Sequence, residues 1–79
     1  MSNIETLVRM VNQIAIFFRT QSEEAAIAGI ADHIRAYWNK DMRRDIYAHL
    51  DAAGEGLDPL ARRAIEQLHA SEERPTMEG

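Results

Sequence analysis

The thirteen residues from Arg35 to Tyr47, RAYWNKDMRRDIY, concentrate the side chains best able to bind another molecule. They include the only tryptophan, both tyrosines and four of the nine Lys/Arg residues of a 79-residue chain with a formal net charge of −4. Aromatic rings and guanidinium groups bind nucleic acids, and they also dominate the contact energy of protein interfaces. The stretch therefore raises two hypotheses: a nucleic-acid-binding helix and a protein-docking surface.

The charge pattern of this stretch favours a protein partner. Asp41 and Asp45 stand among its cations, and a helix that binds DNA seldom presents carboxylates to phosphates. Alternating signs are typical of a solvated face or of a surface that pairs with charges on another protein. Trp38 continues the apolar pattern of the preceding segment, so it is either an interface contact or a core residue that closes the end of a helix bundle. The candidate interface residues are Arg35, Trp38, Lys40, Arg43, Arg44 and Tyr47.

Residues for catalysis or metal binding are scarce. The chain has no cysteine, which excludes thiolate nucleophiles, iron–sulfur ligation and zinc–thiolate sites. None of its histidines has a second histidine four positions away, the spacing that places two metal ligands on one helix face. They fall on three different expected helices, where each is read as a polar rim residue: His33, His49 and His69.

Two other patterns also give no active site. The adjacent carboxylates of Glu23-Glu24 and of Glu72-Glu73 diverge on a helix, so we interpret both pairs as solvated charge. The segment AAGEGLDP has two glycines but lacks the third glycine of a dinucleotide fingerprint and the lysine of a phosphate loop, which leaves a turn. We expect no catalytic, cofactor-binding or metal-binding residue in this chain, which is not an enzyme by itself.

The elements that must position these residues are helices. Four stretches carry apolar residues at three- and four-residue steps, the spacing of one helix face. The first runs from Ile4 to Phe18 and the second from Ser22 to Trp38. The third follows Asn39 and keeps its apolar stripe as far as Ala53. The fourth begins at Pro59, and its pattern ends before Ser71.

Capping signals support these boundaries. Ser2 with Glu5 fits a capping box, and Ser22 is the expected N-cap of the second helix. Asp58 before Pro59 combines a capping acceptor with a proline at the first helical position. The segment 54–56, Gly-Glu-Gly, predicts a stop and a turn, and Leu57 a hydrophobic staple. Gly29, inside the second helix, predicts close packing against another helix.

The predicted fold is all-α: a small bundle of about four helices, with residues 1–70 as a single domain and 71–79 as a flexible, disordered acidic tail. A chain of this size buries only about 60% of the surface that it exposes when unfolded. Without disulfides or a visible metal site, association with another subunit is the remaining ordinary source of extra stability.

Nothing in the sequence predicts a membrane location. The start, MSNIET, lacks the positive region of a secretory signal and carries an acidic residue that a mitochondrial presequence would avoid. The most apolar run, VNQIAIFF, is far shorter than the roughly 20 residues needed to span a bilayer. We therefore expect a cytoplasmic protein with neither a membrane nor a nucleic acid as its partner.

The order of segments resembles that of a known family. From about residue 4 to residue 68 the chain is similar to the delta subunit of soluble, NAD-dependent, molybdenum-containing formate dehydrogenases. The segments that carry the resemblance are MVNQIAIFF, IADHIRAYWNKDMRRDIYAHL and GEGLDPLARRAI.

The resemblance implies a part in a larger enzyme. In that family the bis-guanine-dinucleotide form of the molybdenum cofactor, the iron–sulfur clusters and the FMN lie on other, larger subunits, and the delta subunit contributes no known active-site residue. It implies a non-catalytic accessory subunit that stabilises quaternary structure, with the molybdenum-containing catalytic subunit as the expected partner. Two alternatives remain: a maturation factor that assists molybdenum cofactor insertion, and, with less support, a small DNA-binding regulator.

Overall fold

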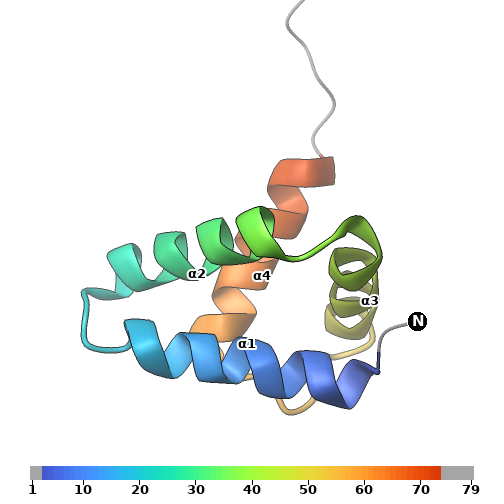
Figure 1. Ribbon diagram of the computed structural model, residues 1–79, viewed down its shortest axis with the longest axis horizontal. Helices are drawn as coiled ribbons and strands as arrows, with labels where there is room; N and C mark the ends of the chain where they lie inside the picture. Colours follow the sequence, from blue (N-terminus) through green and yellow to red (C-terminus); the bar gives the residue numbers. More distant parts are fainter. Residues whose placement is uncertain (1–2, 74–79) are drawn as a thin grey trace, which may run out of the picture.

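The computed structural model describes residues 3–73 and contains four helices: α1 (Ile4–Phe18), α2 (Glu23–Tyr37), α3 (Lys40–Asp51) and α4 (Pro59–Glu73). Within this range there is no strand, so the predicted all-α class and the number of helices are confirmed. Figure 1 shows α1 and α2 running side by side in opposite directions, with α4 crossing behind them. The third helix lies at the end of the pair where α1 begins and α2 finishes, and it packs against α1 and α4.

The core is formed by the apolar stripes that the sequence predicts. All four helices contribute to it, and no charged or polar side chain is buried among the described residues. Each large aliphatic side chain buried there stabilises the fold by about 1.5–3 kcal/mol relative to an exposed one. The largest fully buried side chains are Val11, Ile30, Ile34, Ile46, Ile65 and Leu68.

Side-chain caps fix where the helices begin. The N-cap of α1 is Asn3, whose Oδ1 accepts hydrogen bonds from the backbone N–H groups of Glu5 at 2.8 Å and Thr6 at 3.4 Å. The expected capping box at Ser2 is therefore wrong for this helix start, and Ser2 itself lies outside the described residues. The prediction that Ser22 caps α2 is confirmed, since its Oγ accepts from the Ala25 N–H at 3.2 Å.

The two remaining helices start in the same way. Asn39 caps α3 through a 2.9 Å bond from the Met42 N–H to its Oδ1. Asp58 Oδ1 accepts from the Leu60 N–H at 2.9 Å, directly before Pro59, as the Asp-Pro signal predicts. Each cap satisfies a backbone donor that the first turn of a helix leaves without an intrahelical partner.

The third helix ends earlier than its apolar stripe predicts. Its C-cap is Ala52, and Ala53 follows outside the helix with a φ of 113° instead of facing the core. The N–H of Gly54 donates to the His49 carbonyl at 2.8 Å and that of Ala53 to the Leu50 carbonyl at 3.1 Å. This pair of hydrogen bonds is the Schellman motif. In that motif the first residue after the C-cap, the position of Ala53, is usually a glycine.

The loop between α3 and α4 is fastened to α1 by Asn12. The Asn12 Nδ2 donates to the Gly56 carbonyl at 2.9 Å, and its Oδ1 accepts from the Asp58 N–H at 2.8 Å. Arg19, just beyond α1, adds an ion pair with the Asp58 carboxylate at 3.1 Å. These contacts set the angle at which α4 leaves the loop.

Close packing between α1 and α2 occurs at Gly29, as predicted. A Cβ atom at this position would lie 2.5 Å from the nearest ring carbon of Phe18, so the ring occupies the space of the missing side chain. In the part of the chain that is described, no helix is long and apolar enough to cross a bilayer.

The fourth helix extends beyond the expected domain end at residue 70. It continues to Glu73, so Ser71 and Glu72 are helical and do not belong to a tail. The predicted flexible segment is otherwise residues 74–79, which lie outside the described residues. The extra turn is held by Glu72, whose contacts are described below.

Candidate partner interface

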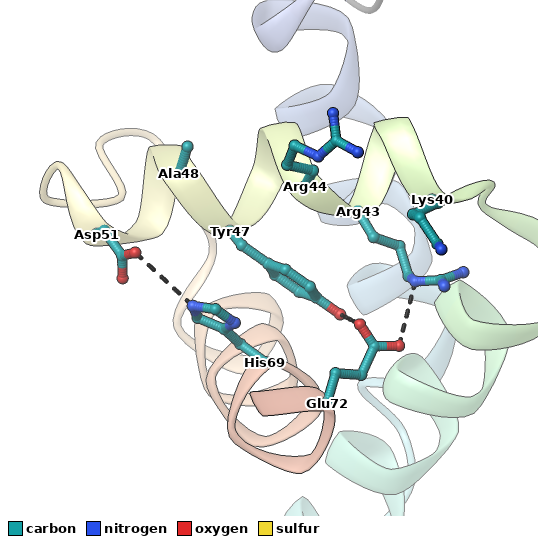
Figure 2. Close-up of a pocket in the computed structure, with 8 residues that line it drawn as sticks. All are labelled: Lys40, Arg43, Arg44, Tyr47, Ala48, Asp51, His69 and Glu72. Atoms are coloured by element: carbon teal, nitrogen blue, oxygen red, sulfur yellow. Dashed lines mark hydrogen bonds and ion pairs between the residues drawn. The ribbon is translucent and has the colours of Figure 1, made fainter. Parts of the chain in front are cut away.

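Four of the six predicted contact residues line one pocket on the surface. Lys40, Arg43, Arg44 and Tyr47 lie on successive turns of α3, and His69 and Glu72 line the pocket from the last turns of α4. In Figure 2 Arg43 and Tyr47 point towards Glu72, whereas Arg44 points away from α4. The pocket has a volume of about 400 Å³. The helical spacing of these residues brings them together, since positions three and four apart share one face.

A single carboxylate ties the two walls together. Glu72 accepts a hydrogen bond from the Tyr47 hydroxyl at 2.7 Å and forms an ion pair with Arg43 at 3.2 Å (Figure 2). Arg43 also donates to the carbonyl of Trp38, at 2.7 Å. The expected role of Glu72 as solvated charge is therefore wrong, because the carboxylate joins α4 to α3.

Tyr47 is held as a neutral phenol in this arrangement. Burial raises the pKa of Tyr47 well above its usual value, and the hydrogen bond to Glu72 and the negative charge of that carboxylate raise it further. Arg43 acts in the opposite direction, with a smaller effect. The Tyr47 ring stacks on the His69 ring with a centroid separation of 4.3 Å, and His69 Nε2 lies 3.7 Å from the Asp51 carboxylate. These contacts make Tyr47 a structural link between helices.

The exposed cations of the predicted set are Arg35, Lys40 and Arg44. Arg44 is 3.6 Å from the Asp41 carboxylate, and Arg35 pairs with Asp32 at 2.8 Å; both pairs are within one helix and highly exposed. Such surface pairs contribute little stability and are readily exchanged for another partner. These cations are therefore the ones available to a docking protein.

Trp38 is a core residue rather than an exposed contact. Only 4% of it is accessible, which matches the alternative that it closes the end of the bundle. It follows α2 as the C-cap in an extended conformation, and one edge of the residue lines a second hollow on the protein surface. Neither Trp38 nor Arg35, the two other predicted contact residues, lines the pocket of Figure 2.

The second hollow was missed by reasoning from the sequence. It is an apolar groove of about 440 Å³ between α1 and α2, and the start of α3 closes one end. Phe17 and Tyr37, one on each wall, are each 75% exposed. Phe17 comes seven residues after Met10 and widens the apolar face of α1, and nothing in the periodicity of α1 shows how far α2 covers that face. The lining residues are Met10, Gln13, Ile14, Phe17, His33, Tyr37, Trp38 and Met42.

Neither hollow has the groups of a metal centre. Within residues 3–73 no three His, Asp or Glu side chains are grouped closely enough to hold a metal ion. Most charged groups of the pocket in Figure 2 are already paired: Arg43 with Glu72, His69 with Asp51, and Arg44 with Asp41, which lies outside the pocket lining.

Comparison with known proteins gives one match. A family model described as the NADH-dependent formate dehydrogenase delta subunit, FdsD, matches residues 6–65 of this 79-residue chain. The matched segment contains α1 from its third residue onward, all of α2 and α3, and the first turns of α4. No curated protein and no solved structure matches the chain.

Proposed function

Because the chain belongs to the family of NADH-dependent formate dehydrogenase delta subunits, we propose that it is a non-catalytic accessory subunit that stabilises the assembled enzyme by protein–protein contacts. The family match is the observation that carries this proposal. Under this proposal, formate oxidation takes place on the larger subunits, which also hold the molybdenum, iron–sulfur and flavin cofactors. The partner is the molybdenum-containing catalytic subunit.

The surface chemistry supports a protein partner over a nucleic acid. Arg43 is 19% exposed in its side chain and is committed to Glu72 and to the Trp38 carbonyl. The other cations on the exposed side of α3 are Lys40 and Arg44, and Arg44 is paired with Asp41. A helix that neutralises phosphates needs several cations free of competing carboxylates.

We assign the contact to the exposed part of the predicted set, Lys40 and Arg44, together with Arg35. The buried members, Trp38 and Tyr47, and the largely buried Arg43 shape this surface without contributing much area to it. Exposed charges at the edge of an interface set the association rate and the choice of partner more than they set the final affinity.

A charge reversal tests this surface without disturbing the fold. The double variant Lys40→Glu/Arg44→Glu leaves the Arg43–Glu72 link intact, so we expect the chain to fold and its co-purification with the larger subunits to fall by roughly tenfold or more. The control is Arg63→Glu, because Arg63 is a similarly exposed cation, paired with Glu23, between α4 and α2. Equal recovery of the double variant and the control would contradict the assignment of the surface.

A further inference from the structure

The groove between α1 and α2 is an apolar surface that the fold leaves uncovered. Its lining includes no Lys, Arg, Asp or Glu side chain, and an adjoining hollow of about 250 Å³ extends it past Phe18. Two aromatic side chains, Phe17 and Tyr37, stand on opposite walls with three-quarters of their surface exposed. Exposed aromatic side chains are enriched at the contact sites of proteins.

Two cations that neighbour groove-lining residues in the sequence have no carboxylate of residues 3–73 within ion-pair distance. Among the Lys and Arg side chains of residues 3–73, all except Arg9 and Lys40 have a carboxylate within ion-pair distance. Arg9 directly precedes Met10 and lies one helical turn before Gln13, and both of these residues line the groove. Lys40 comes between Trp38 and Met42, which line it from the other side. The groove therefore has mostly apolar walls, to which Gln13 and His33 add polar groups, and Arg9 and Lys40 lie beside its lining residues in the sequence without an ion pair.

We propose that this groove binds an amphipathic helical segment of a larger formate dehydrogenase subunit, with large apolar side chains inserted between Phe17 and Tyr37 and carboxylates placed against Arg9 and Lys40. The inference rests on the proposed function, and it names the surface through which the chain would bind a larger subunit. A hollow between two antiparallel helices fits the helix-in-groove mode of recognition. The alternative of strand addition needs an exposed sheet edge, and the described part of the chain has no strand.

Charge also distinguishes this occupant from a second copy of the chain. In a two-fold dimer through the groove, each copy would present the same patch to the other. The two copies would then bring Arg9 and Lys40 of both chains into one interface that offers no unpaired carboxylate from the groove lining. Like charges of this kind oppose association, whereas an acidic partner segment removes the repulsion.

The test removes the apolar contact while keeping the fold. In the double variant Phe17→Ser/Tyr37→Ser, the altered side chains are mostly exposed, so thermal unfolding should change little. The fraction of chain that co-purifies with the larger subunits should fall at least about tenfold, as truncation of aromatic anchors typically causes. The matched control is Ile16→Ser, which removes an apolar side chain that is 57% exposed on α1 and does not line the groove. This control should co-purify like the wild type.

The outcomes separate this inference from the function on which it rests. If the wild-type chain and the double variant bind the larger subunits equally well, the groove is not the docking site, although the accessory role stands. If the wild-type chain binds none of the larger subunits, the proposed function itself fails. If the isolated chain is a dimer and the double variant a monomer, a second copy occupies the groove, which overturns the inference.

A second measurement identifies the occupant. A photoreactive phenylalanine analogue at position 17, in the assembled complex, should cross-link to a peptide of a larger subunit that contains apolar residues at helical spacing and nearby Asp or Glu. A cross-linked peptide with a basic or uncharged sequence would contradict the assignment of Arg9 and Lys40 as the charged edge.

Discussion

At the scale of single residues, Glu72 determines the structural role of Arg43 and Tyr47, which lie in the aromatic and basic segment of α3. Its carboxylate binds both the Tyr47 hydroxyl and the Arg43 guanidinium, so two side chains with the chemistry of interface contacts are used to fasten α4 (Figure 2). Arg43 continues the connection to the Trp38 carbonyl and so supports the turn between α2 and α3. Substitution of these residues should alter stability as well as any docking.

The Tyr47 contact predicts a specific pH dependence of stability. Tyr47→Phe should lower the free energy of unfolding near neutral pH by about 1–2 kcal/mol, because a hydrogen bond to a carboxylate is lost. The pKa of Tyr47 is raised in the folded state, so this contribution is complete below the ordinary tyrosine pKa of about 10 and is lost as the pH rises above that value.

Urea unfolding between pH 7 and 11 provides the measurement. The free energy of unfolding of the wild type should fall more steeply above pH 10 than that of Tyr47→Phe, so the difference between the two proteins should shrink. The exposed lysine and the remaining tyrosine are common to both proteins and cancel in the comparison. A difference that stays constant across this range would show that the hydroxyl of Tyr47 is not held by Glu72.

The sequence predicts the neighbours of these residues better than their roles. Helical spacing is enough to place Lys40, Arg43, Arg44 and Tyr47 on one face, which the structure confirms. It does not show that Glu72, some thirty positions later in the chain, supplies a carboxylate to that face, because that contact depends on where α4 ends. For Trp38 the apolar register indicated the core as one of two alternatives, and the structure selects it.

At the scale of elements, the end of α3 contains a strained position. Ala53 adopts a φ of 113°, a conformation that costs an L-residue with a Cβ about 1–2 kcal/mol and a glycine much less. The Schellman bonds and the Arg62 Nη1 donor, 2.9 Å from the Ala53 carbonyl, hold it there. The apolar period could not reveal this, since alanine fits a helix stripe as well as a turn.

Ala53→Gly should therefore stabilise the protein. We expect the free energy of unfolding to rise by about 0.5–1 kcal/mol, after allowance for the greater flexibility of glycine in the unfolded chain. The control is the neighbouring Gly54→Ala, which should destabilise by about 1–2 kcal/mol. Its φ is +65°, and a Cβ there would lie 2.6 Å from Arg62 Nη1. Destabilisation by Ala53→Gly in urea unfolding would contradict this description of the α3 terminus.

The element boundaries show where local signals are sufficient. Ser22 and the Asp58-Pro59 pair were recognisable because each places a capping side chain at the start of an apolar period. At α1, two capping residues stand next to each other, and the structure uses Asn3. The last turn of α4 could not be predicted, because residues 71–73 have no apolar period and a tertiary contact through Glu72 holds the helix there.

At the scale of the whole molecule, the fold is a small apolar core with several surface hollows, and within residues 3–73 no three His, Asp or Glu side chains are grouped closely enough to hold a metal ion. The first turns of α3 take part in two of them: Lys40 and Arg43 line the pocket of Figure 2, and Met42 lines the groove. The two contacts that we propose would together form one docking surface across α1, α2 and α3. The chain could hold the subunits together, or it could assist molybdenum insertion. The molybdenum content of complexes purified with and without the chain distinguishes these two roles. Full molybdenum content in complexes that lack the chain would exclude a role in insertion.

The measurement that tests the central claim most directly is purification of the tagged chain from cells that co-express the larger formate dehydrogenase subunits, followed by native mass spectrometry and an assay of formate oxidation. We predict one assembly that contains the chain together with the larger subunits and oxidises formate, whereas the isolated chain has no activity. Recovery of the chain free of every larger subunit, or formate oxidation by the isolated chain, would contradict its assignment as a non-catalytic accessory subunit.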